Sequence, residues 1–184
     1  MSKNTLRSQL IEKRNGLSVA ARKALSDDIS NRLIELLPNH SLRIGSYIAL
    51  GSEVDLTPLH AKIMASSNRL YIPRILSKTT MEMAALDTVE QLTQGTYGIQ
   101  TSTQDETIAM RALDWLIIPC SGFDRRGYRL GMGGGYYDRA LENCPPETPV
   151  RIGVAFATQE SEFEPDPWDQ SFDWIITENE FIRR

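Results

Sequence analysis

Short apolar runs alternate with helix-forming stretches from residue 42 to the end of this 184-residue chain. The apolar runs have the length of buried strands, and several of the stretches between them are long enough for a helix. Strands separated by helices that pack back on the same sheet form a parallel or mixed sheet with helices on its faces. The sequence therefore predicts an α/β domain with a mostly parallel, mixed central sheet.

The alternation places strands and helices at definite positions along the chain. Expected strands cover residues 44–50, 70–75, 81–86, 115–119, 151–156 and 173–177. Expected helices lie near residues 56–66, 105–113 and 136–143. Because no internal repeat and no Pro- or Gly-rich linker interrupts this pattern, residues 1–184 are expected to form a single domain.

Two helices are expected ahead of the sheet. In the first, Leu6, Leu10 and Ile11 recur at helical spacing among basic residues, and the pattern ends at Asn15-Gly16. The second begins with Ser18 as N-cap and ends before Pro38. Together they predict an N-terminal helical hairpin.

Composition excludes several classes of protein. The net charge of −4 argues against a nucleic-acid binder, which usually carries a basic surplus. No run approaches the roughly 20 apolar residues that span a membrane, and the N-terminus lacks a signal-peptide core, so a cytoplasmic location is expected. The two cysteines and two histidines lack the spacing of a metal site or a Ser-His-Asp hydrolase. No segment shows surplus apolar surface, which favours a monomer.

A glycine-rich segment, residues 122–141 (GFDRRGYRLGMGGGYYDRAL), follows the apolar run 113–119. Glycines there can take positive φ and bring backbone N–H groups against an anion. A helix starting at Tyr136 and four arginines would add positive charge, and Asp138 could hold Mg²⁺ beside phosphates. The arginines are Arg125, Arg126, Arg129 and Arg139. The segment matches neither the Walker A nor the full dinucleotide pattern, so a mobile surface loop is the alternative interpretation.

The chain resembles the 5-formyltetrahydrofolate cyclo-ligase family along almost its whole length. The resemblance rests on the basic N-terminal helix, on residues 51–59 (GSEVDLTPL) and 71–75 (YIPRI), and on 129–138 (RLGMGGGYYD). It implies an ATP- and Mg²⁺-dependent enzyme that converts 5-formyltetrahydrofolate to 5,10-methenyltetrahydrofolate, releasing ADP and phosphate. It also implies a three-layer α/β fold like that of the sugar-phosphate isomerase and CoA-transferase group.

The resemblance also implies roles for individual residues. Its catalytic residues would be Arg129, Gly133 and Tyr137. Its ATP contacts would be Lys3, Asn4, Thr5, Leu6, Arg7, Arg129, Leu130, Gly131, Met132, Gly133, Gly134, Gly135, Tyr136 and Tyr137. Its substrate contacts would be Ile48, Glu53, Gly131, Met132, Gly133, Gly134 and Gly135. Its magnesium ligands would be Asp138 and Asp169.

Ordinary structural roles remain open for some of these residues. Lys3 and Arg7 suit the solvated face of a helix, and Glu53 suits a turn at the end of a strand. Trp168 suits packing at a rim better than stacking on a pterin.

One departure from the family pattern concerns Thr101 and Ser102, which stand where relatives often have a Glu-Pro pair. This departure leaves two alternatives open: a folate- or nucleotide-binding protein without ligase activity, and a ligase of the same fold acting on another pterin-like substrate.

Overall fold

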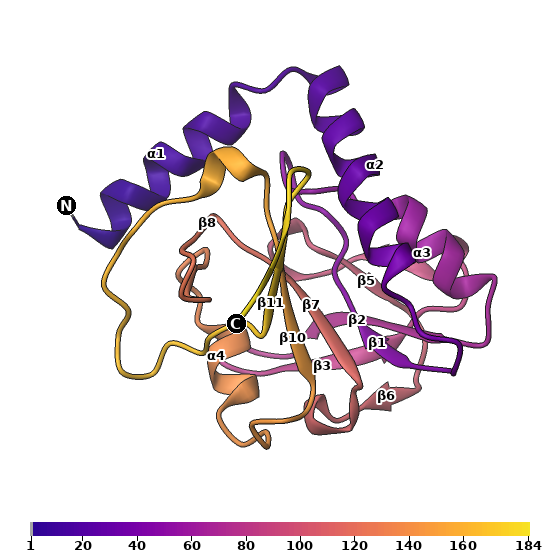
Figure 1. The fold of residues 1–184 in the computed structure, drawn as a ribbon. Helices are drawn as coiled ribbons and strands as arrows, with labels where there is room; N and C mark the ends of the chain where they lie inside the picture. The colour runs from indigo at the N-terminus through magenta and orange to yellow at the C-terminus, as the bar shows by residue number, and fades with distance from the viewer. Residues whose placement is uncertain (1) are drawn as a thin grey trace.

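An eight-stranded sheet runs through the computed structural model of the protein, which describes residues 2–184 (Figure 1). Its strands are β1 (Arg43–Gly45), β2 (Arg69–Ile75), β3 (Met81–Ala85), β6 (Thr107–Ile108), β7 (Trp115–Pro119), β10 (Val150–Val154), β11 (Trp174–Ile176) and β12 (Phe181–Arg183). Their order is β12-β11-β10-β7-β1-β2-β3-β6. From β11 to β2 all neighbouring strands are parallel, and the strands at both edges are antiparallel. The predicted mostly parallel, mixed sheet is confirmed.

The remaining elements are helices, two small hairpins and four short 3₁₀ turns. The helices are α1 (Lys3–Asn15), α2 (Val19–Glu35), α3 (Thr57–Met64) and α4 (Tyr136–Leu141). The hairpins pair β4 (Leu92–Gln94) with β5 (Gln100–Ser102) and β8 (Gly122–Phe123) with β9 (Arg129–Leu130). The 3₁₀ turns are η1 (Val89–Gln91), η2 (Thr96–Gly98), η3 (Met110–Ala112) and η4 (Ala157–Gln159). No helix within residues 2–184 has both the length and the apolar character needed to cross a bilayer.

Alternate residues of the strands build a core on each face of the sheet. On β7, Trp115 and Ile117 pack on one face with α2 and α3, through residues such as Ile29 and Ile63. Leu116 and Ile118 pack on the other face with α4 and its neighbours. Side chains alternate across a strand, so the unbroken apolar run of β7 reports burial on both faces. The sheet is therefore the middle of three layers.

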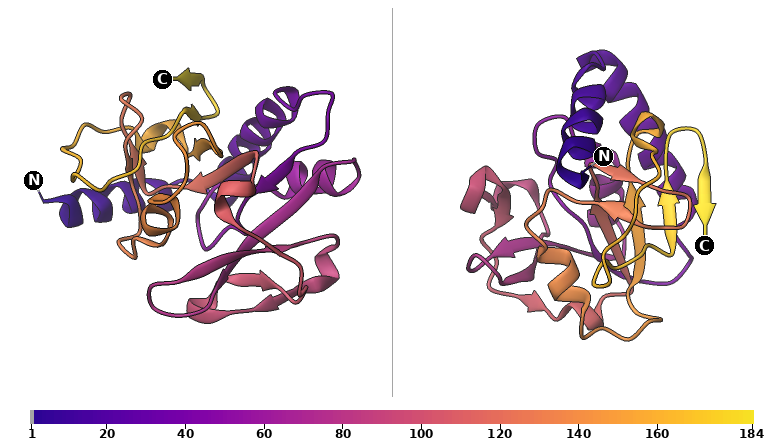
Figure 2. Two further views of the ribbon diagram at one scale, coloured as in Figure 1. Left: turned by 90° about the horizontal axis from the view of Figure 1, so that it is seen from below. Right: turned by 90° about the vertical axis from the view of Figure 1, so that its left-hand side faces the viewer.

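The two N-terminal helices are joined by a short turn, but they do not form the expected packed hairpin. Helix α1 begins at Lys3 with Ser2 as N-cap, and its Leu6 and Leu10 pack against Leu130 and Phe163 from the last third of the chain. Figure 2 shows α1 beside this part of the molecule, apart from α2. Helix α2 covers the sheet and α3 instead. The separation places α1 next to the glycine-rich segment.

Two other expectations are corrected by the structure. The strand expected over 44–50 ends at Gly45, because the chain leaves the sheet there and the hydroxyl of Tyr47 donates to the carbonyl of Val54 (2.7 Å). The helix expected near 105–113 is the two-residue strand β6, which pairs with β3, followed by the single turn η3. The helices expected near 56–66 and 136–143 are present as α3 and α4.

Candidate active site

The carboxyl ends of the parallel strands open into a cavity of about 1160 Å³. Tyr47 and Ile48 follow β1, Ile75 ends β2, and Cys120 follows β7, and all four line this cavity. Ligands of open α/β sheets usually bind at this edge. The loop 131–135 and α4 form much of the remaining wall.

The glycine loop, residues 131–135, joins β9 to α4 and lines the cavity along its full length. Gly133 and Gly135 have φ of 91° and 62°, which side-chain-bearing residues rarely adopt. Gly135 is the N-cap of α4, so the helix begins at Tyr136 as predicted. The loop lines the cavity, and its residues 132–134 are also exposed at the surface.

The four arginines of the segment have different partners. The hairpin between β8 and β9 turns on buried Asp124, whose carboxylate accepts backbone N–H groups of the turn and the guanidinium of Arg126. Arg125 is paired with Glu160 and Glu180. Neither arginine lines the cavity, whereas Arg129 and Arg139 do. The expectation that all four arginines supply charge to one anion site is therefore wrong for Arg125 and Arg126.

The N-terminal helix meets the glycine loop in this cavity. Arg7 donates through Nε to the carbonyl of Gly131 (2.6 Å), and Lys3 bridges Asp166 and Asp169 at 2.7 Å each. Burial disfavours the charge on Lys3, but hydrogen bonds to the two aspartates outweigh it and raise the Lys3 pKa. The structure thus brings together the two regions expected to contact ATP, and Lys3 and Arg7 are more than a solvated helix face.

The three residues between Lys3 and Arg7 do not line the cavity. Asn4 accepts a hydrogen bond from Arg7 (2.6 Å), Thr5 donates its N–H to the N-cap Ser2, and Leu6 is buried on the far side. These contacts orient Arg7 and dock the helix. Direct contact of Asn4, Thr5 and Leu6 with ATP stays a prediction that this geometry does not favour.

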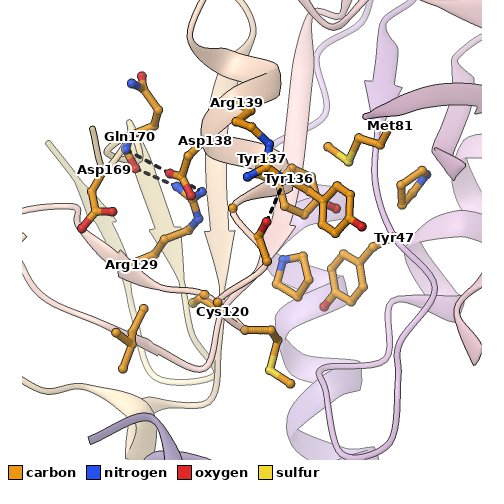
Figure 3. Close-up of a pocket in the computed structure, with 18 of the residues that line it drawn as sticks. Tyr47, Met81, Cys120, Arg129, Tyr136, Tyr137, Asp138, Arg139, Asp169 and Gln170 are labelled. Carbon is orange, nitrogen blue, oxygen red and sulfur yellow. Dashed lines mark hydrogen bonds and ion pairs between the residues drawn. The ribbon is translucent and has the colours of Figure 1, made fainter. Parts of the chain in front are cut away.

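Two carboxylates expected to bind magnesium lie at the cation-rich end of the cavity (Figure 3). Asp138 accepts from Arg129 (2.6 Å) and from the backbone N–H of Gln170 (3.2 Å) through Oδ1. Asp169 accepts from Lys3 and from the N–H of Asp166 (2.8 Å). No group of three or more acidic, histidine or cysteine side chains in residues 2–184 is arranged to hold a metal. Mg²⁺ usually takes one or two carboxylates plus phosphate oxygens and water, so this donor set suits a metal that arrives with a nucleotide.

The other end of the cavity is aromatic, and the carboxylate of Glu53 lies in its lining. Tyr47, Tyr136 and Tyr137 gather there with Met81, away from the Arg129–Asp138 pair (Figure 3). Burial raises the Tyr137 pKa, so its hydroxyl stays protonated. Glu53 accepts the N–H of Leu50 (2.9 Å); burial raises its pKa, while that hydrogen bond and the charge of Arg14 oppose the rise. Ile48, Leu130 and Met132 also line the cavity.

Tyr97 is a cavity residue that the sequence did not single out. It is 62 % exposed, lines the cavity and has φ of 60°, a backbone conformation that is uncommon for an aromatic residue. It lies beside Tyr136. Burial and a hydrogen bond with Tyr97 raise the pKa of Tyr136. Nothing in the pattern of residues around Tyr97 signals a left-handed conformation, so only the structure reveals it.

Thr101 and Ser102, the departure from the family pattern, are buried in β5 outside the cavity lining. Thr101 donates to the carbonyl of Pro73 (2.9 Å), and Ser102 accepts the N–H of Gln104 (3.1 Å). The Thr101 side chain therefore holds the β4–β5 hairpin against β2, and the Ser102 side chain stabilises the turn that follows β5. Both residues have structural roles outside the cavity lining.

Known proteins resemble the chain in sequence and in structure. A 5-formyltetrahydrofolate cyclo-ligase from Mycoplasma pneumoniae is 30 % identical over 97 % of this chain and 99 % of its own length. The Escherichia coli K12 protein of that name is 26 % identical over 90 % of this chain and 94 % of its own. The solved 5,10-methenyltetrahydrofolate synthetase of Aquifex aeolicus superposes with a TM-score of 0.86 at 31 % identity, covering all of this chain and 93 % of that one.

A second solved synthetase, from Mycoplasma pneumoniae, gives a TM-score of 0.80 at 29 % identity and covers 97 % of this chain and 99 % of that one. The model of the 5-formyltetrahydrofolate cyclo-ligase family matches residues 1–178. Sequence and fold thus agree, and the chain belongs to the 5-formyltetrahydrofolate cyclo-ligase family, whose members are ligases.

Proposed function

We propose that this ligase converts 5-formyltetrahydrofolate and ATP to 5,10-methenyltetrahydrofolate, ADP and phosphate in the cavity between the glycine loop and the ends of β1, β2 and β7. One observation carries the proposal: a single cavity joins a glycine loop flanked by cations to an aromatic surface that carries Glu53. A nucleotide and a folate would share this space with their reacting groups at the middle.

The triphosphate would lie along residues 131–135, between Arg129 and the basic residues of α1. The position of Gly133 supports this placement. A Cβ built on Gly133 would lie 3.8 Å from the guanidinium carbon of Arg7. An anion bound against the Gly133 backbone would therefore lie beside the positive charge of Arg7. Lys3 and Arg7 come from one helix and Arg129 from the β8–β9 hairpin. Phosphoryl transfer depends mainly on such positioning and charge.

Magnesium would be held by Asp138 and Asp169 together with phosphate oxygens, and it would neutralise charge on the transferred group. Asp138 is paired with Arg129 and Asp169 with Lys3, so these basic side chains hold the carboxylates in place before the nucleotide arrives. Both cations would then be available for the phosphates.

The folate would lie at the aromatic end, with Tyr47, Tyr136 and Tyr137 around its rings and Glu53 accepting ring N–H groups. Its formyl oxygen would attack the γ-phosphorus of ATP, forming a C–O–P bond and releasing ADP. N10 would then attack the formyl carbon, the C–O bond would break, and phosphate would leave with the N10 proton. Arg129 and Gly133 are expected to face the charge that develops, and Tyr137 the reacting formyl group.

The assay follows the absorbance of methenyltetrahydrofolate after protein, Mg-ATP and 5-formyltetrahydrofolate are mixed. Product should form only with both substrates present, in a one-to-one ratio with ADP. Absence of product at high enzyme concentration would contradict the proposal, and tight folate binding without ATP turnover would indicate a binding protein. Faster turnover of another formylated pterin would indicate a different substrate. The position of Thr101 and Ser102 outside the cavity lining supports the first of these outcomes.

A further inference from the structure

Arg14 is a buried cation beneath the folate end of the cavity. It ends the apolar face of α1 and is 5 % exposed. Its Nε donates to the hydroxyl of Ser52 (2.9 Å), and that hydroxyl donates to the side chain of Asn15. The other guanidinium N–H groups have no acceptor in the described chain, residues 2–184. The two terminal nitrogens keep contact with solvent, since neither is among the buried atoms that lack a partner. Burial of the rest of the side chain disfavours its charge and lowers the Arg14 pKa.

The residue next to Ser52 is Glu53. Ser52 and Glu53 belong to one turn, whose geometry is fixed on one side by Arg14 and Asn15 and on the other by the bond from Leu50 N–H to Glu53 Oε2. Among the acids, Glu53 is the one whose charge acts most strongly on Arg14. No salt bridge joins the two within the described residues, so Arg14 acts on Glu53 through the turn and through space.

We propose that Arg14 is a positioning residue for substrate binding: it fixes the 50–53 turn and keeps the Glu53 carboxylate ionised beside the pterin. This inference rests on the proposed role of Glu53 in folate binding. Without the nearby cation, a carboxylate buried among tyrosines would take up a proton and lose its capacity to accept two ring N–H groups.

The groups around Glu53 make its ionisation measurable. The pKa values of Tyr47, Cys120 and Tyr137 are raised by burial, that of Cys120 to about 12, so all three stay protonated below pH 9. Burial lowers the pKa of His60 on α3 to about 4, so it stays neutral at higher pH. Of the groups in this part of the cavity, Glu53 is the one whose protonation burial brings closer to neutral pH, because burial raises its pKa.

The test measures the dissociation constant of 5-formyltetrahydrofolate by calorimetry from pH 5.5 to 8. In the unaltered protein, affinity should fall as the pH is lowered through the Glu53 pKa. Arg14→Met should move this fall in affinity to higher pH. Folate binding should be about tenfold weaker at pH 6 and much less affected at pH 8. A tenfold change corresponds to the loss of about one charge-assisted hydrogen bond. Arg14→Lys keeps the charge and should leave the pH of the fall close to that of the unaltered protein.

Matched variants separate this role from a merely structural one. Arg32→Met removes an arginine of α2 that binds the carbonyls of residues 178 and 179, and it should not move the profile. Ser52→Ala breaks the hydrogen bond of Arg14 but keeps its charge, and it should weaken binding equally at all pH values. Glu53→Gln should remove the pH dependence of folate affinity. The double variant, Glu53→Gln with Arg14→Met, should show no pH dependence either.

Each result decides between the two proposals. If Glu53→Gln alters neither affinity nor its pH dependence, the proposed role of Glu53 in folate binding is wrong. If Glu53→Gln removes the pH dependence but Arg14→Met leaves it in place, or weakens binding by one factor at every pH, the inference about Arg14 is overturned.

Discussion

Asp138 is the cavity acid held most firmly, because Arg129, which pairs with it at 2.6 Å, is 7 % exposed. We expect Asp138→Asn to lower kcat by about 10²-fold, the usual cost of losing one electrostatic contact to a transition state, while folate affinity changes less than about twofold. Methenyltetrahydrofolate absorbance and calorimetry measure the two effects. An unchanged kcat would remove Asp138 from the mechanism.

The matched control for this variant is Asp105→Asn, which removes an exposed carboxylate outside the cavity. It should leave both quantities unchanged. Thermal unfolding of Asp138→Asn is needed as well, because the change leaves the Arg129 guanidinium with a weaker partner. A loss of kcat in a fully folded variant is the decisive observation.

Trp168 is exposed to 66 % at the edge of the cavity, beside Asp169. The other two tryptophans, Trp115 and Trp174, pack edge to face with ring centroids 5.4 Å apart, outside the cavity lining. ATP binding near Lys3 and Asp169 should therefore change the fluorescence of Trp168 alone. Titration of ATP should alter the emission of the unaltered protein and leave that of Trp168→Phe constant. A signal that survives in Trp168→Phe would place the nucleotide elsewhere.

At the scale of elements, α1 serves the site through its apolar face. Leu10 is 1 % exposed and packs with Leu130 at the root of the glycine loop. Leu10→Ala should lower the free energy of unfolding by about 2–5 kcal/mol. It should also raise KM for ATP about tenfold, because Lys3 and Arg7 would have to be ordered on binding.

Denaturant unfolding and initial rates at varied ATP measure these two effects. Val19→Ala on α2, whose side chain is 75 % exposed, is the control and should change neither. If Leu10→Ala destabilises the chain but leaves KM for ATP unchanged, α1 has no role in holding the nucleotide.

Several elements that the sequence predicted correctly have a clear hydrophobic pattern of their own. The apolar run of β7 and the spacing of Leu6 and Leu10 in α1 report burial directly. The strands β5, β8 and β9 have two or three residues, too few for a period, and form only because distant segments pair with them. The spacing of Met110 and Leu113 suits a helix, but β3 captures the preceding residues as β6.

The candidate site follows the same division. The sequence predicted the glycine loop together with Arg129 and Asp138, because these residues follow one another closely in the chain. Arg14, Tyr97 and Asp124 were not, because their roles depend on partners or backbone angles that no local pattern encodes. Arg125 and Arg126 were wrongly assigned to phosphate for the same reason. Glu160 and Glu180, the partners of Arg125, lie far along the chain, and Asp124 becomes the partner of Arg126 only in the turn of the β8–β9 hairpin.

For the whole molecule, buried His60 couples stability to pH. Burial lowers its pKa from 6.5 to about 4, so between these values the unfolded chain binds a proton that the folded chain refuses. Stability should therefore fall as the pH drops from about 6.5 to 4, by up to about 3 kcal/mol. His60→Gln should flatten this dependence in urea unfolding, and His40→Gln, at an exposed position, should not. An unchanged slope in His60→Gln would assign the effect to other groups.

The bridge from Lys3 to Asp166 and Asp169 joins residues more than 160 positions apart. Lys3 begins α1, whereas both aspartates lie in the segment that leads into β11. A fragment of the chain that ends before residue 166 cannot form this bridge, so the bridge belongs to the fold as a whole. Local opening of either segment would break both ion pairs at once.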